Sequence, residues 1–222
     1  MNIQRVDIYR SIHKGLRAFL SDTLLAVGRM DFMSDVELQA GLHRLQGLLT
    51  FCEKHLQHEN EFVHPAMQAC SPGSADDMNA HHEQHVEMIG ELRLLAETLN
   101  NAPIESRETH AAVLYRKLAL FVADNLAHMH EEETRNNEIL WQGYNDEQIM
   151  AIHDAILRAI PADENAIAMH WMLSAFNHQE RHQLLDGMKK QAPREVFELT
   201  LDLARNTLPV GEWNKLQSAI GM

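Results

Sequence analysis

The chain has 222 residues, of which 45% are hydrophobic, so it is long enough to bury one large core or a core with an appendage. Its formal net charge is −13 with neutral histidine, which argues against the basic surfaces that nucleic acid and anionic membranes require. This balance is compatible with binding cations, and the 15 histidines favour a metal-binding protein.

The cysteines and the N-terminus indicate a reducing compartment. Cys52 and Cys70 form neither a CxxC pair nor a disulfide framework, as is usual for cytosolic proteins. The first residues lack the apolar stretch of a signal peptide, and no apolar run is long enough to span a membrane. We therefore expect a cytoplasmic protein with no nucleic-acid partner and no membrane partner.

Apolar residues recur at helical spacing in four long segments, which predicts four long helices. These helices cover about residues 6–27, 34–64, 74–100 and 103–140. Ser34 or Asp35 is the expected N-cap of the second helix, with Glu37 in its first turn. Pro65 is expected to end that helix, and Pro103 to open the fourth, since a first turn accepts proline.

The chain from about Tyr144 onward reads as shorter helices with tight turns. Asn145 and the pair Asn177 and Glu180 are expected caps, and prolines separate the later runs. The predicted fold class is all-α: an up-down-up-down four-helix bundle over residues 1–142, with a C-terminal helical subdomain over residues 143–222 packed against it. This second segment has no metal-ligand pattern.

Two helices carry the same pair of metal-binding residue types. His55 precedes Glu59 by four residues, and His128 precedes Glu132 by four. Side chains one helical turn apart can converge on one ion. One such pair occurs by chance on many solvated helix faces, but here the pair recurs late in the second and fourth helices and suggests an internal pseudo-repeat.

Histidines early in the first and third helices complete the pattern. In an up-down-up-down bundle, early positions on odd helices and late positions on even helices lie at the same end. Seven side chains are therefore expected to meet at one level: His13, His55, Glu59, His81, His85, His128 and Glu132.

Five imidazoles and two carboxylates suit a divalent metal such as iron, zinc or manganese. The absence of cysteine ligands favours non-haem iron over structural zinc, with zinc or manganese as substitutes. Seven ligands exceed the needs of one ion, and two bridging carboxylates would join two ions into a pair.

From about Val6 to Leu140 this ligand series resembles haemerythrin and its bacterial haemerythrin-like (HHE) relatives. The resemblance implies an oxo- or hydroxo-bridged pair of non-haem irons, with Glu59 and Glu132 as bridging carboxylates. One iron would be bound by three histidines, and the other by two, with an open position for a small ligand. These two sets would be His81, His85 and His128, and His13 and His55.

The sequence departs from the family pattern at one ligand. The haemerythrins that define the family carry an aspartate five residues after the histidine of the fourth helix. Here Glu132 lies at four residues and Glu133 at five, so Glu133 is an alternative to Glu132. His82 is likewise an alternative to His81.

Other conspicuous polar residues are not expected to ligate metal. Three histidines next to the ligands in sequence, His58, His64 and His130, are expected to be solvated or to lie in an outer shell. Tyr9, one turn before His13, is expected to pack in the ordinary way, and the alternative is a hydrogen bond near the site.

The functional prediction is a protein that binds or senses a diatomic ligand, dioxygen or nitric oxide, or iron itself, rather than an enzyme. The alternative is a di-iron enzyme or iron donor that reduces nitric oxide or peroxide or repairs iron–sulfur clusters. A third reading is a helical scaffold with incidental histidines. The C-terminal helices are expected to cover the bundle, contact a protein partner or form a homodimer.

Overall fold

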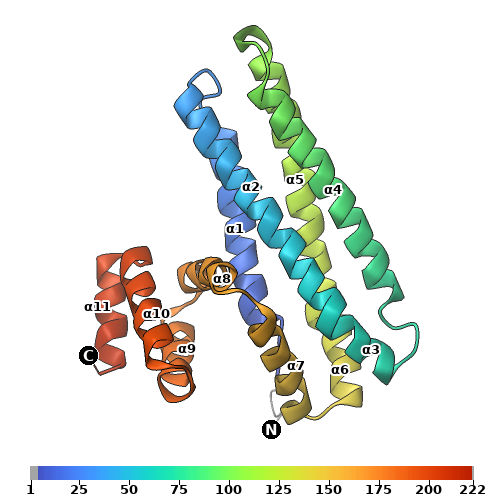
Figure 1. Ribbon diagram of the computed structural model, residues 1–222, viewed down its shortest axis with the longest axis vertical. Coiled ribbons are helices and arrows are strands. Elements are labelled where there is room, and N and C mark those ends of the chain that lie inside the picture. The colour runs from blue at the N-terminus through green and yellow to red at the C-terminus, as the bar shows by residue number, and fades with distance from the viewer. Residues whose placement is uncertain (1–4, 222) are drawn as a thin grey trace. The chain divides into compact units, whose positions relative to one another are not determined.

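A computed structural model describes residues 5–221, and every regular element within that range is helical. The all-α prediction is therefore confirmed, and the helices are labelled in Figure 1. The longer elements of the N-terminal part are α1 (Arg10–Arg29), α2 (Asp35–His58), α4 (Asp76–Asn100) and α5 (Arg107–Glu131). A single 3-10 turn, η2 (Ile104–Ser106), follows Pro103 and leads into α5.

The second predicted helix does not end at Pro65, which corrects the sequence reading. A π-helical turn, η1 (Glu59–Val63), follows α2 directly and leads into α3 (His64–Cys70). Proline breaks an α-helix because it lacks an N–H and clashes with the preceding turn. Here Pro65 occupies the first turn of α3, immediately after a wider turn has already interrupted the α-helical hydrogen bonds.

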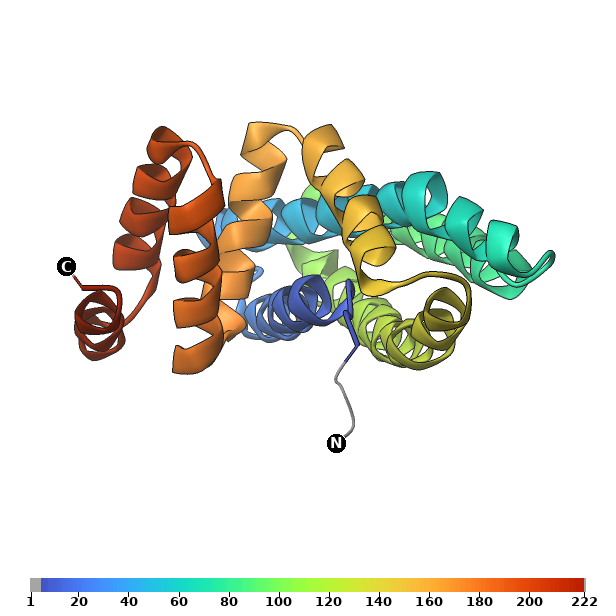
Figure 2. The same cartoon turned by 90° about the horizontal axis from the view of Figure 1, so that it is seen from below.

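The fourth predicted helix has the same construction. A π-helical turn, η3 (Glu132–Asn136), joins α5 to α6 (Asn137–Gly143). We call α2–η1–α3 the first composite helix and α5–η3–α6 the second. They run alongside α4 in both views, with α2 against α4, α4 against α5 and α3 against α6 (Figure 1 and Figure 2).

The bundle core follows the predicted apolar stripes. On α2, Leu45, Leu48 and Leu49 are buried, and their counterparts on α5 include Leu118 and Phe121. A second apolar cluster lies toward the far end of the composite helices: Ile8, Tyr9, Val63, Met67, Ala75, Leu140 and Ile149. Polar side chains between these two clusters therefore have packed apolar side chains on both sides along each composite helix.

The far end of the bundle is also tied to the N-terminal segment. The Arg5 guanidinium donates to Asp146 Oδ1 at 2.6 Å and to the Tyr144 carbonyl at 2.7 Å. The Trp141 indole donates to the Val6 carbonyl at 2.7 Å. These bonds hold the segment before α1 against α6 and the start of α7 (Asp146–Ala159).

The chain forms two compact units. The first contains the described residues up to Tyr9 together with Phe19–Ala159, and the second contains Arg10–Ala18 and Ile160 onward. α7 thus belongs to the first unit, and the domain boundary after residue 142 stays a prediction.

Besides the start of α1, the described part of the second unit contains the short helices α8 (Ala162–Ala175), α9 (His178–Gln191), α10 (Arg194–Thr207) and α11 (Val210–Ala219). Its core includes Leu173, Leu185, Ala204 and Leu216. The predicted capping box is present, with the Asn177 side chain accepting from the Glu180 N–H. The Ser34 and Asn145 caps are confirmed as well, accepting from Glu37 N–H and Gln148 N–H. No helix among residues 5–221 has the length and apolar character needed to cross a membrane.

Candidate metal centre

The two glutamates of the repeated pair both open a π-helical turn. Glu59 is the first residue of η1 and Glu132 the first of η3. The N–H of His64 bonds to the Glu59 carbonyl, and the N–H of Asn137 bonds to the Glu132 carbonyl, five residues back in each case. Single π turns inside α-helices occur frequently at functional sites, so the pseudo-repeat extends from the sequence to the backbone.

Both glutamate side chains are buried and face the same imidazole. Glu59 is 3% exposed and Glu132 is 0% exposed. The Nε2 atom of His82 lies 3.6 Å from Glu59 Oε2 and 3.6 Å from Glu132 Oε1. It also lies 3.1 Å from Nε2 of His128. These four side chains form one group whose potential ligand atoms are all within 4.8 Å of one another.

The tautomer of His82 shows what this group can hold. Its Nδ1 lies 2.7 Å from the amide oxygen of Asn60, which can only accept, so Nδ1 carries the hydrogen. Nε2 therefore directs a lone pair toward two carboxylate oxygens that are themselves acceptors when ionised. A cation satisfies such a convergence of electron pairs. Ligand atoms about 2.1 Å from a shared ion lie about 3.0–3.4 Å apart, close to the separations found here.

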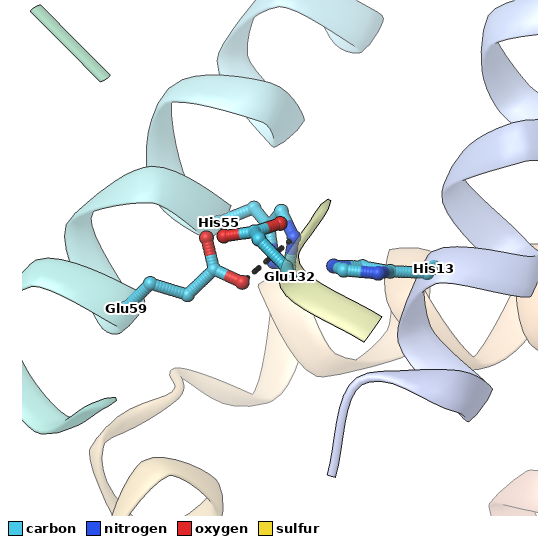
Figure 3. Close-up of side chains that lie close together, drawn as sticks. All are labelled: His13, His55, Glu59 and Glu132. Carbon is cyan, nitrogen blue, oxygen red and sulfur yellow. Dashed lines mark ion pairs between the residues drawn. The ribbon is translucent and has the colours of Figure 1, made fainter. Parts of the chain in front are cut away.

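A second group shares both glutamates. It contains His13, His55, Glu59 and Glu132, again with potential ligand atoms within 4.8 Å of one another. Figure 3 shows the His55, Glu59 and Glu132 side chains turned toward one another, with the His13 ring directed at them from α1. The Nε2 atom of His55 lies 3.3 Å from Glu59 Oε1, matching the 3.3 Å from His128 Nε2 to Glu132 Oε1.

Two of the expected histidines lie elsewhere. The side chain of His81 is 40% exposed, with its Nδ1 4.0 Å from Glu131, whereas the side chain of His82 is 2% exposed. The structure thus brings the alternative His82, not His81, to the glutamates. The reason is the buried stripe of α4, which includes Met78, His82, His85, Ile89 and Leu92. Met78 was the sequence signal for this register.

His85 is buried as expected but belongs to neither group. Its Nε2 bonds to Asp124 Oδ2 at 2.6 Å, and its ring centre lies 4.7 Å from that of His128. Of the two alternative glutamates, Glu132 is fully buried and grouped with the imidazoles, whereas Glu133 is only half-buried.

Burial favours the neutral form of three imidazoles in this region. Removal from water lowers the pKa of His82 to about 4, against a partial compensation from nearby Glu132. The pKa of His85 and that of His64 are lowered for the same main reason. Neutral imidazoles are the form that binds metal, and at pH 7 the His82 ring adds no positive charge beside the two carboxylates.

The environment of Tyr9 reflects the same negative charge. Tyr9 is 2% exposed, and its hydroxyl accepts a hydrogen bond from the Asn136 amide at 3.2 Å. Burial first, and then the Glu132 and Glu59 carboxylates, raise the pKa of Tyr9 well above its usual value. A neutral phenol therefore lies near the glutamates, so the hydrogen bond near the site does form.

Comparison with known proteins agrees with this geometry. A family model described as the hemerythrin HHE cation binding domain matches residues 4–138. That range contains both composite-helix glutamates and all the histidines of the two groups. No curated protein and no solved structure matches the chain.

Proposed function

Because the chain belongs to the hemerythrin HHE cation-binding family and carries His/Glu groups fit to bind metal, we propose that it binds two non-haem irons and a small diatomic ligand, dioxygen or nitric oxide. One observation carries the proposal. The two candidate ligand groups share Glu59 and Glu132, which is the arrangement needed for two ions bridged by two carboxylates.

The proposed ligands are divided between the two irons. His13 and His55 serve one, and His82 and His128 serve the other, in place of the set with His81 expected from the sequence. An iron pair supplies a redox-active centre to which a small molecule can coordinate. Glu59 and Glu132 balance its positive charge, and their burial keeps water from competing with them.

The surrounding residues favour reversible binding. Leu56 and Val63 are buried on either side of Glu59 along the first composite helix, and Met129 is buried one turn before Glu132. This apolar surround excludes water and suits a small uncharged ligand. The hydrogen bond between the Asn60 side chain and Nδ1 of His82 also fixes the orientation of the His82 ring before metal binds.

Metal analysis combined with absorption spectroscopy tests the proposal. The protein is loaded with Fe²⁺ without oxygen, its iron is counted, and spectra are recorded before and after exposure to air and then azide. We expect two irons per chain and an oxo-bridged ferric spectrum that azide alters. Loaded protein without that spectrum would refute the di-iron assignment. Catalytic turnover of nitric oxide or peroxide, in place of reversible binding, would reassign the protein to an enzyme.

A further inference from the structure

His64 is a buried histidine that neither metal group includes. It is 3% exposed, and its ring centre lies 4.7 Å from that of His82. Its Nδ1 lies 2.6 Å from Oδ1 of Asn79. Its Nε2 is buried and has no hydrogen-bond partner among the described residues. A buried nitrogen of this kind calls for an explanation, because an unsatisfied polar atom destabilises the folded state.

The hydrogen bond to Asn79 determines what that nitrogen can do. An amide oxygen only accepts, so Nδ1 of His64 donates and Nε2 carries a lone pair. His82 has the same arrangement toward Asn60. The two pairs are reciprocal across the helices: His64 and Asn60 lie on the first composite helix, and His82 and Asn79 lie on α4. Both imidazoles are therefore held as neutral rings with Nε2 available as a ligand atom.

The π turn explains how His64 comes to lie near the centre. In a continuous α-helix, a residue five positions after Glu59 is rotated by about 140° from it. The five-residue turn of η1 brings His64 back toward the face of Glu59. The second composite helix repeats this placement, because Asn137, five residues after Glu132, is fully buried with its Oδ1 lacking a hydrogen-bond partner among residues 5–221.

We propose that His64 is a further metal ligand, providing through Nε2 a third imidazole to the ion bound by His82, His128 and the shared glutamates. This inference rests on the proposed function and adds a residue to the same centre. It makes the two ions unequal, with three imidazoles on one and the His13 and His55 pair on the other. The open position for a small ligand then belongs to the second ion.

His85 is the competing candidate for the third imidazole. Its ring is tethered through Nε2 to Asp124 Oδ2 at 2.6 Å, on a side chain that is 53% exposed. Its Nδ1, which is adjacent to the Cβ attachment, is the ring nitrogen that is buried without a hydrogen-bond partner among the described residues. His64 offers the less hindered Nε2 and has the same amide-fixed ring as His82, so the structure favours His64.

Titration with Co²⁺ tests this assignment, because the visible absorption bands of cobalt report its coordination. Cobalt also avoids the reaction with air that a di-iron pair would undergo. The wild type, His64→Asn, His85→Asn and the surface control His81→Asn are compared. His64→Gln is a second variant that fills more of the same space, and circular dichroism verifies that each protein is folded. We expect two cobalt ions per chain for the wild type and for His81→Asn.

For His64→Asn and His64→Gln we expect one of the two binding steps to weaken by at least about tenfold, the effect of disturbing even an outer-shell partner, with altered visible bands from that ion. Unchanged affinities and bands in both His64 variants would overturn the role of His64 and leave the proposed function intact. The same holds if His85→Asn alone shows the loss. A wild-type protein that binds neither cobalt nor iron would instead refute the proposed function itself.

Discussion

Replacing Glu59 with glutamine should have opposite effects on the metal-free and the metal-loaded protein. Glu59 is 3% exposed; its Oε1 lies 3.3 Å from His55 Nε2 and its Oε2 lies 3.6 Å from His82 Nε2. It therefore reaches both candidate ions, whereas His55→Ala should disturb one ion only. Glutamine preserves the shape of the side chain but removes the charge that binds both metals.

The magnitudes follow from binding linkage and burial. A metal present at 100 times its dissociation constant stabilises the fold by about 2.7 kcal/mol per site, and a hundredfold loss of affinity reduces this to about 0.4 kcal/mol. Without metal, the wild type must keep two carboxylates buried close together or take up a proton. The glutamine amide removes that cost and can donate to the His82 lone pair, so the metal-free variant should be more stable by about 1–3 kcal/mol.

Urea denaturation monitored by circular dichroism, with and without Zn²⁺, measures both effects. Glu61→Gln is the matched control, because Glu61 belongs to the same π turn but is exposed, and it should behave as the wild type. The reasoning would be refuted if Glu59→Gln were less stable than the wild type without metal and still gained the wild-type stabilisation from zinc.

Three other predictions concern pH, packing and the second unit. Burial lowers the pKa of His82 to about 4, whereas a histidine in the unfolded chain has a pKa of about 6.5. Between these two pH values the unfolded chain binds more protons than the folded one, so the metal-free protein should lose up to about 3 kcal/mol of stability as the pH falls from 6.5 to 4. Urea titrations at several pH values should show this slope, and His82→Asn should flatten it. Gly143→Ala would make a Cβ collide with the Cys70 sulfur and should cost about 1–3 kcal/mol; adding Cys70→Ala should restore only part of this, because the Cβ of residue 70 would still lie 2.9 Å away. Arg181 is buried and donates to the Leu173 carbonyl at 2.7 Å and to Glu212, so Arg181→Met should destabilise the protein by about 2–3 kcal/mol without changing its metal content; a loss of metal would contradict that separation.

Much of the fold was predictable because its signals are local. The apolar spacing of residues such as Leu45, Leu48 and Leu118 marks the buried faces of helices wherever they pack. The capping side chains of Ser34, Asn145 and Asn177 accept hydrogen bonds from N–H groups three residues further along the chain. The local sequence alone therefore specifies these caps. The placement of Glu59 and Glu132 with His55 and His128 followed from helical spacing and an antiparallel order of helices.

The exact make-up of the centre was not predictable, because it depends on how the helices are rotated against one another. His81 and His82 are adjacent, so a rotation of α4 by one residue exchanges which of them faces the glutamates. The burial of His64 was not predictable for a related reason. An uninterrupted α-helix would turn it away from Glu59, whereas the π turn of η1 returns it to the buried face beside His82.

The sequence by itself determined the helical fold class, the paired glutamates and the end of the bundle where they meet, because each depends on contacts within a few residues or on helix order. The tertiary structure alone decided which imidazoles face those glutamates and that Pro65 lies inside a composite helix. These outcomes depend on the energy of packing whole helices together, where one extra residue in a turn rotates every side chain that follows it.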